Sequence, residues 1–234
     1  MTEQEFISYC SSHNLSLTSK QLEELNTYQQ LLKEKNKVMN LTGIVEKDEV
    51  FEKHYLDSLL FSFDENLENS KCIDVGTGAG FPGLVLAICY PTIQMTLLEP
   101  LTKRCVFLEE VVKTLGLTNV IIANERSEDF CKKHRDEFDF AFARAVSKLN
   151  LLIEIIMPLV KVNGYFVALK GKIYQEEIKE ANNALKELDS KVEKVKESTL
   201  PSEQDVRGNI FIKKLKKSSL KYPRNYGQIK KRPL

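Results

Sequence analysis

Short apolar segments alternate with amphipathic ones from residue 71 to the C-terminus. They predict strands at residues 71–76, 93–100, 119–124, 138–143, 164–171, 191–198 and 209–217. The first five segments are almost continuously apolar, as are strands of a parallel sheet that is covered on both faces. In the last two, apolar and polar residues alternate, which is typical of antiparallel strands. The pattern therefore predicts an α/β fold with a mostly parallel sheet.

Helical periodicity fills the gaps between these strands. The expected helices cover residues 83–90, 102–116, 127–134, 148–160 and 175–188. We expect Thr102 to cap the second of these helices and Gly116 to end it.

The first 65 residues also have helical periodicity. Thr18 and Gln21 form a capping-box pattern ahead of several leucines, and we expect that helix to end at Gly43. A second amphipathic helix is predicted over residues 48–63, with Asp48 as its cap. The chain thus divides into an N-terminal helical extension (1–65), an α/β domain (66–217) and a basic C-terminal tail (218–234).

Composition indicates an ordinary globular protein, with 42% hydrophobic and 29% charged residues. Its five cysteines include no Cys-x-x-Cys pair and its three histidines lie far apart, so we expect no metal site and no disulfide framework. The opening "MTEQEFISYC" is acidic and lacks an apolar signal segment. The uncharged stretch from Val75 to Leu98 is interrupted by glycines and prolines, so no membrane segment is expected. These features favour a cytoplasmic protein.

Charge is distributed unevenly along the chain. Residues 206–234 contain ten Lys or Arg and no Asp or Glu, although the whole chain has 34 basic and 33 acidic residues. A basic segment on an otherwise acidic body indicates a polyanionic partner. The alternative is a lysine-rich, solvated edge strand.

Four glycines follow the first predicted strand directly, in "DVGTGAGFPG". In parallel sheets of this kind, ligands bind beyond the carboxyl ends of the strands. Glycine permits positive φ and lets a ligand approach the backbone. Glu99 ends the next strand, where a carboxylate accepts hydrogen bonds from ribose hydroxyls. We therefore expect a nucleoside-containing cofactor; a merely tight strand-to-helix turn would require fewer glycines.

The identity of that nucleoside is less constrained. Gly78-x-Gly80-x-x-Gly83 matches the dinucleotide fingerprint, so an NAD-dependent dehydrogenase is a contender. Asp74 favours S-adenosylmethionine, because a carboxylate at the strand tip would attract an ammonium group and repel a pyrophosphate. The two closing strands also suit a methyltransferase sheet.

The chain resembles the bacterial glucose-inhibited division protein B family, the small-subunit ribosomal RNA methyltransferase G group. The resemblance spans nearly the whole chain and rests on "NLTG", "HYLDSLL", "DVGTGAGFPGLVLAI", "FARAVSKL", "ALKG" and "YPRNYGQIKKRPL". It implies a class I methyltransferase fold, with a Rossmann-like seven-stranded sheet behind an N-terminal helical extension. It also implies S-adenosylmethionine-dependent methylation of a guanosine at N7, in 16S ribosomal RNA or the small ribosomal subunit.

The resemblance further implies cofactor contacts from Gly76, Phe81, Ser127, Glu128 and Arg144. The family often has alanine at the position of Ser127, so a contact through the backbone amide is the one that would survive there. From the residues themselves, Asp74, Gly78 and Glu99 complete the predicted cofactor site.

No general base is expected in this reaction, because guanine N7 has a free lone pair and no proton to lose. The strand end has "ARAVS" instead of the Asn-Pro-Pro-aromatic motif of amine methylation, and no Pro-Cys nucleophile. Catalysis would then rest on positioning, with Arg144 as the candidate residue. Arg144 would hold the cofactor or a phosphate; alternatively, it pairs with an acid such as Glu128 or Asp74.

Basic residues near the C-terminus are candidates for RNA contact, with Tyr222 and Tyr226 interleaved for base stacking. The predicted RNA-binding residues are Lys170, Arg207, Lys221, Arg224, Lys230, Lys231 and Arg232. For Lys170, a solvated strand-end lysine is an equal alternative. His54 and Asp57, three residues apart on the extension, either face the RNA or pack against the main domain.

The sequence thus predicts a monomeric rRNA methyltransferase. The alternatives are a dehydrogenase, which would bind NAD; a methyltransferase of small molecules, against which the basic tail argues; and a non-enzymatic RNA-binding protein, against which the glycine loop argues.

Overall fold

A seven-stranded sheet forms the centre of the molecule, with strand order β3-β2-β1-β4-β5-β7-β6. The computed structural model describes residues 1–203 and 206–234. Strands β1 to β5 are parallel, whereas β7 runs antiparallel to both β5 and β6. The strands are β1 (Lys71–Val75), β2 (Gln94–Leu98), β3 (Val120–Ala123), β4 (Phe138–Arg144), β5 (Val160–Lys170), β6 (Ser190–Thr199) and β7 (Val206–Lys214). All seven predicted strands are confirmed, as is the mostly parallel α/β class.

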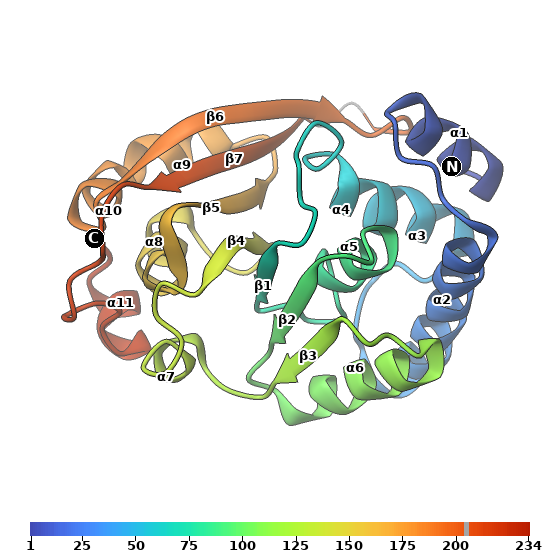
Figure 1. Ribbon diagram of the computed structural model, residues 1–234, viewed down its shortest axis with the longest axis horizontal. Coiled ribbons are helices and arrows are strands. Elements are labelled where there is room, and N and C mark those ends of the chain that lie inside the picture. Colours follow the sequence, from blue (N-terminus) through green and yellow to red (C-terminus); the bar gives the residue numbers. More distant parts are fainter. Residues whose placement is uncertain (204–205) are drawn as a thin grey trace.

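Helices cover both faces of this sheet (Figure 1). On one side lie α1 (Glu3–Ser12), α2 (Ser19–Met39), α3 (Lys47–Val50), the π-helix η1 (Phe51–Leu56), α4 (Asp57–Leu59), α5 (Gly83–Cys89) and α6 (Thr102–Leu115). On the other lie α7 (Ser127–Phe130), α8 (Leu149–Ile156), the 3₁₀ turn η2 (Met157–Leu159), α9 (Tyr174–Glu180), α10 (Asn182–Glu187) and α11 (Tyr226–Lys231). Adjacent residues of β1 serve opposite faces, because Cys72 packs into the first core and Ile73 into the second.

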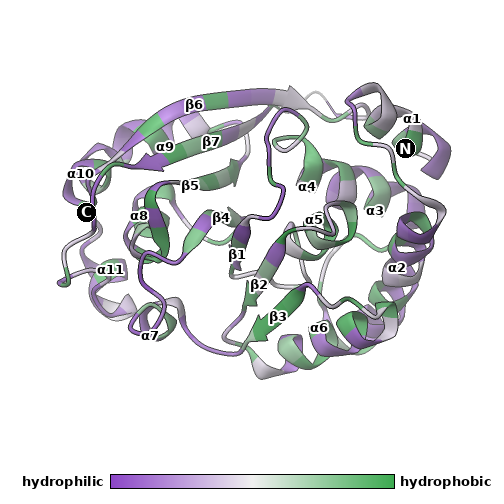
Figure 2. Ribbon diagram, in the orientation of Figure 1, coloured by the Kyte–Doolittle hydropathy of each residue, from purple (hydrophilic) through white to green (hydrophobic). Residues whose placement is uncertain are grey.

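The edge strand β6 has a different pattern, since one face of it meets solvent. Only its first residue, Ser190, is buried, and most of the strand is hydrophilic (Figure 2). Lysines on an exposed edge strand discourage pairing with other chains.

The two ends of the chain are integrated into the same cores. Phe6 and Tyr28 of the N-terminal helices lie in one hydrophobic cluster with Phe142 and Phe211 of the sheet. At the C-terminus, Tyr222 and Ile229 are buried in the cluster around α8. The division at residues 65 and 217 therefore stays a prediction, and the segments on either side of each boundary share a core.

Local signals set some helix ends as expected and others differently. The Thr18–Gln21 capping box and the left-handed Gly116 that ends α6 are confirmed. Three predicted caps are wrong. Helix α2 ends at left-handed Asn40 and not at Gly43, α3 begins after Glu46 and not at Asp48, and Leu101 precedes α6.

Other helices differ in length from their predicted ranges. Helix α7 is a single turn, α8 gives way to η2 before Pro158, and the helix predicted over 175–188 is interrupted at Ala181. Within the described residues, no helix has the length and apolar character that crossing a membrane requires. No cluster of three metal-ligating side chains occurs there either.

Candidate functional site

The four glycines after β1 serve two different purposes. A Cβ on Gly80 would lie 2.4 Å from Leu84, and one on Gly83 would lie 2.4 Å from Leu97, so packing of the loop against α5 and β2 excludes side chains there. Gly78 has φ +62° and no neighbour closer than 4.0 Å to an added Cβ. The positive φ therefore favours glycine at residue 78, where the space stays open, while close packing demands it at 80 and 83.

Asp74, at the end of β1, is completely buried beneath this loop. Its Oδ2 accepts hydrogen bonds from Thr77 Oγ1 at 2.6 Å and from Gly83 N at 2.8 Å. Its Oδ1 is buried and has no partner among the described residues. Burial raises the pKa of Asp74 to about 6, against the hydrogen bonds and the Arg144 charge, which lower it. The site thus contains a carboxylate oxygen without a donor.

Glu99 lies at the end of the neighbouring strand β2 and is 1% exposed. Its two oxygens accept hydrogen bonds from Gly78 N at 3.0 Å and from Leu101 N at 2.9 Å. Arg104 Nη1 approaches one of them at 3.5 Å. Backbone amides of the loop after β1 and of the loop after β2 therefore hold the Glu99 carboxylate at the carboxyl ends of the strands.

Glu99 and part of the glycine loop line a cavity of about 540 Å³, which we call the loop cavity. Its wall is formed by Leu41, Thr42, His54, Gly76, Thr77, Gly78, Ala79, Phe81, Glu99, Pro100, Leu101, Arg104, Arg144, Ala145 and Val146. Of the predicted cofactor residues, Gly76, Gly78, Phe81, Glu99 and Arg144 are thus brought together in this wall. Asp74 is buried behind the wall, hydrogen-bonded to Thr77, which lines the cavity.

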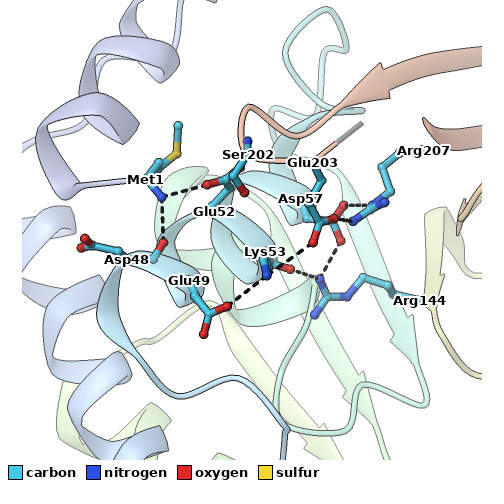
Figure 3. A network of polar contacts seen from close by, with 10 residues as sticks. All are labelled: Met1, Asp48, Glu49, Glu52, Lys53, Asp57, Arg144, Ser202, Glu203 and Arg207. Carbon is cyan, nitrogen blue, oxygen red and sulfur yellow. Dashed lines mark hydrogen bonds and ion pairs between the residues drawn. The ribbon is translucent and has the colours of Figure 1, made fainter. Parts of the chain in front are cut away.

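Arg144, the last residue of β4, connects the sheet to the N-terminal extension (Figure 3). Its Nη1 donates to Asp57 Oδ2 at 2.9 Å and to Lys53 O at 3.2 Å, and Nη2 lies 3.2 Å from His54 Nδ1. Its guanidinium also lies over the Phe81 ring, 5.1 Å from the centroid. The alternative role of Arg144, pairing with an acid of the protein, is therefore found, but the acid is Asp57 of the extension and not Glu128 or Asp74.

The π-helix η1 explains how the extension supplies several acceptors to one guanidinium. π-helical turns are rare and occur frequently at functional sites. Lys53 and His54 belong to η1, and Asp57 follows it directly. Asp57 Oδ1 also accepts a hydrogen bond from Arg207 Nε of β7 at 3.1 Å, so two arginines share its carboxylate, one on each oxygen (Figure 3).

His54 is buried and acts as an acceptor in this cluster. Desolvation, with a contribution from the nearby Arg144 charge, lowers the pKa of His54 to about 3. The ring is therefore neutral near pH 7, and its Nδ1 accepts from Arg144 while Nε2 faces Thr42 Oγ1 at 2.9 Å. The ring stacks on Phe81 at 4.3 Å between centroids. His54 and Asp57 thus pack against the main domain.

A second cavity, of about 670 Å³, adjoins the loop cavity; we call it the strand-end cavity. The two share His54, Arg144, Ala145 and Val146 in their walls. Ala145 has φ +54°, a left-handed conformation that is costly for a residue with a side chain. The remainder of the wall is Lys53, Asp57, Ser147, Lys148, Leu169, Lys170, Gly171, Ile173, Glu177, Arg207 and Asn209. The structure therefore has two compartments on either side of one short strand-end segment.

Comparison with known proteins identifies the family. The family model GidB, described as rRNA small subunit methyltransferase G, matches residues 21–206. The ribosomal RNA small subunit methyltransferase G of Thermoanaerobacter pseudethanolicus is 46% identical over 216 residues, which cover 91% of this chain and 90% of that protein. The protein of the same name from Lactobacillus acidophilus is 41% identical over 239 aligned positions, covering both chains completely.

This chain belongs to the rRNA small subunit methyltransferase G family. The family predicted from the sequence motifs is thereby confirmed.

Solved structures give the fold class of this family member independently. The crystal structure of M. jannaschii TYW2 in complex with AdoMet has a TM-score of 0.58 at 16% identity, covering 74% of this chain and 80% of that chain. A SAM dependent methyltransferase from Aquifex aeolicus has a TM-score of 0.54 at 18% identity, covering 71% and 93%. The predicted methyltransferase fold is confirmed.

The residues around the loop cavity fit the cofactor expected of this family. The Oδ1 of Asp74 is a buried oxygen without a donor, and an ammonium group would provide one. Gly78 leaves open space where a side chain would intrude. Asp74 itself lines neither cavity, and two further predicted contacts do not either. Ser127 and Glu128 line neither cavity, and the Ser127 hydroxyl donates to Ile155 O at 3.4 Å, so their role near the adenine stays a prediction.

The predicted RNA-binding residues fall into two groups. Four of them have an acidic partner within the protein. Lys170 pairs with Glu177, and Arg207 pairs with both Asp57 and Glu203. Lys221 pairs with Glu187, and Arg224 pairs with Glu154. Lys230, Lys231 and Arg232 are exposed at the end of α11, and their side chains have no acidic partner among the described residues. Contact with RNA stays a prediction for all seven. The positive charges of the second group are exposed and not neutralised by an acidic partner among the described residues.

Some site residues could not be predicted from the sequence, because their role depends on the side chains that they contact in the folded protein. Thr42, the Lys53 carbonyl and Asn209 had no distinguishing pattern. The three-residue spacing of His54 and Asp57 was a signal, since it places both on one helical face, but their common partner Arg144 is distant in sequence.

Proposed function

We propose that the protein transfers the methyl group of S-adenosylmethionine to N7 of a guanosine in 16S ribosomal RNA. Family membership supports the rRNA methyltransferase class. The observation that carries the proposal is the pair of adjoining cavities, which share only His54 and the segment 144–146. One compartment suits a nucleoside cofactor and the other a base, with the reacting atoms meeting at the shared wall.

In this proposal, the loop cavity holds the cofactor and the chain supplies position, not acid–base chemistry. S-adenosylmethionine, when bound, supplies an electrophilic methyl group on a sulfonium. Asp74 and Glu99 would hold its ammonium and ribose groups, and Phe81 with Val146 would exclude water from the reacting atoms. Orientation of two reactants contributes about 7–11 kcal/mol at best in well-aligned systems. His54 is neutral and already hydrogen-bonded, so it is not needed as a base.

The proposal is tested by incubating the purified protein with labelled S-adenosylmethionine and 16S rRNA that lacks the modification. We expect incorporation of label and aniline-induced scission at one methylated purine, which maps the target nucleotide. Parallel reactions contain an adenine- or cytosine-methylating enzyme as controls for the chemistry. Incorporation without scission would contradict N7 methylation, and stabilisation of the protein by NAD alone would favour the dehydrogenase.

Cofactor affinity should depend on pH through Asp74. Because the pKa of this carboxyl is raised to about 6 by burial, it is protonated below that pH and then cannot pair with an ammonium group. Binding therefore favours the deprotonated form, and affinity falls as pH decreases. Calorimetry should find binding about tenfold weaker at pH 5 than at pH 7.

The Asp74→Asn variant is the control for this dependence, because it keeps the size of the side chain and removes the titration. Its affinity should be low and nearly constant between pH 5 and pH 7. A wild-type protein whose affinity is equally constant over that range would contradict the role of Asp74.

The exposed cations of α11 are proposed to contact RNA phosphates. Replacing Lys230, Lys231 and Arg232 together by alanine should weaken rRNA binding and make its salt dependence shallower, by about 2 in the slope of log K against log salt. The same replacement of Lys191, Lys194 and Lys196 on edge strand β6 is the control and should leave that slope unchanged. Equal slopes for the wild type and the α11 variant would contradict contact between these three residues and RNA phosphates. A monomeric state and a cytoplasmic location complete the proposal.

A further inference from the structure

A polar side chain in the wall of the strand-end cavity has a buried donor that the described residues leave without a partner. Asn209, on β7, is 2% exposed and contributes to the cavity wall. Its backbone pairs with Leu169 of β5, which places it at the carboxyl end of the parallel strands, near Arg144. A cavity of about 670 Å³ is large enough for a purine base.

Within residues 1–203 and 206–234, the amide nitrogen of Asn209 has no hydrogen-bond partner. Nδ2 is one of four buried side-chain atoms without a partner among the described residues. Other polar groups in the same wall are satisfied: Lys170 by Glu177 and Ser147 O, and Asp57 by two arginines. Native proteins rarely leave a buried donor unpaired, and such exceptions occur where a ligand supplies the partner. Asn209 thus brings an unpaired donor to the wall of a cavity in which Lys170 and Asp57 are already paired.

We propose that Asn209 recognises the C6 keto oxygen of the target guanine and so distinguishes guanine from adenine. The inference rests on the proposed function. O6 neighbours N7 on the purine, so a base whose N7 faces the shared wall carries O6 close to that wall. Guanine presents an acceptor at this position, whereas adenine presents an amino group, which is a donor.

The surroundings of Asn209 strengthen this discrimination. Lys170 and Arg207 lie in the same wall and are donors only. With Nδ2 of Asn209 directed at the base, an amino group at C6 would meet a donor, while the carboxylates of the same wall, Asp57 and Glu177, are already paired with cations; a buried donor left unpaired is strongly disfavoured. Asn209 is a specificity-determining residue in this scheme and takes no part in bond formation.

Replacing Asn209 with leucine tests the assignment, because leucine has a similar volume and no polar atom. We expect kcat/KM on unmodified rRNA to fall about tenfold, while the melting temperature of the free protein stays unchanged or rises. Removing an unsatisfied buried group does not destabilise a protein, whereas removing a structural hydrogen bond does. Ser198→Ala, which removes another unpartnered buried group on β6, is the control and should keep wild-type kcat/KM.

A second measurement examines the base itself. Small-subunit rRNA is assembled with guanosine, inosine or 2,6-diaminopurine at the mapped target; the first two have the C6 keto group and the third has an amino group. The wild-type enzyme should methylate the inosine RNA within about threefold of the guanosine RNA, and the diaminopurine RNA at least about tenfold more slowly. Asn209→Leu should reduce this preference to near unity.

Two results would overturn the assignment: equal rates on guanosine and diaminopurine RNA with the wild type, or a leucine variant within twofold of wild-type kcat/KM. A wild-type enzyme that methylates none of the three RNAs would instead refute the proposed function, and the assignment would fall with it.

Discussion

Replacing Arg144 with alanine is expected to lower kcat for rRNA methylation by about 100-fold or more, with the fold intact. Arg144 lies in the wall shared by the two cavities and is held by Lys53, His54 and Asp57. A displacement of about 1 Å between reacting groups is sufficient for a loss of this order. Rates with saturating rRNA and cofactor measure the effect directly.

The variant should remain folded because its partners keep other contacts. Asp57 still pairs with Arg207 at 3.1 Å, so no carboxylate is left alone in the interior. His54 retains its stacking on Phe81. The lost hydrogen bonds should cost about 1–2 kcal/mol of unfolding free energy, which urea denaturation would measure.

Two further variants separate charge from geometry. Arg144→Lys keeps the positive charge but cannot donate to three acceptors in one plane, so we expect it to be nearly as inactive as the alanine variant. Asp57→Asn tests the extension's part in positioning, and combining it with Arg144→Ala should add little to the loss. Full activity of Arg144→Ala would refute the role, and additive losses in the double variant would show that Asp57 acts independently.

The strands of this fold could be predicted because their signal is local. A buried parallel strand must be apolar on both faces, so the sequence of β1 or β2 reveals it without knowledge of its neighbours. The same holds for Gly116, where a left-handed residue ends α6. The caps at Gly43, Asp48 and Thr102 were mistaken because several nearby residues compete for each helix end, and tertiary packing decides among them.

The site residues likewise fall into those with a local sequence signal and those whose contacts join distant parts of the chain. Asp74 and the glycine loop are contiguous, so their chemistry could be inferred from the residues, although two of the four glycines serve packing. Arg144 was a candidate from its place at a strand end, but its partner Asp57 is 87 positions away. Nothing in the local sequence indicates that η1 is a π-helix directed at that arginine. Contacts of this kind depend on how the extension docks.

The C-terminal segment illustrates how composition can mislead. Counting charges made residues 218–234 a uniform basic tail, yet Arg224 is directed inward. It donates from Nε and Nη2 to the two oxygens of Glu154, at 2.7 Å and 2.6 Å, and its backbone amide adds a third hydrogen bond at 3.0 Å. Glu154, on α8, is completely buried. The ion pair therefore fastens the segment that carries α11 to the body of the protein.

Replacing Arg224 with alanine should destabilise the protein by about 3 kcal/mol, because removing one partner leaves a buried carboxylate without its counter-charge. For a chain of this length, such a loss lowers the melting temperature by roughly 6–12 °C. Calorimetry or circular dichroism would measure it. Lys221→Ala is the matched control in the same segment, since its pair with Glu187 is 62% exposed on the lysine side and should contribute little to stability.

A compensating change identifies the cause of this loss. Glu154→Gln in the Arg224→Ala background removes the unpaired charge and should restore at least half of the lost stability, although it restores no ion pair. If Arg224→Ala melts at the same temperature as Lys221→Ala, the pair does not anchor the segment. If Glu154→Gln restores nothing, the loss arises from packing of the arginine stem and not from the buried carboxylate. Restoration by glutamine would also mean that rRNA binding by α11 can be measured in a stable protein whose Arg224 is absent, which separates the anchoring of the segment from its contact with RNA.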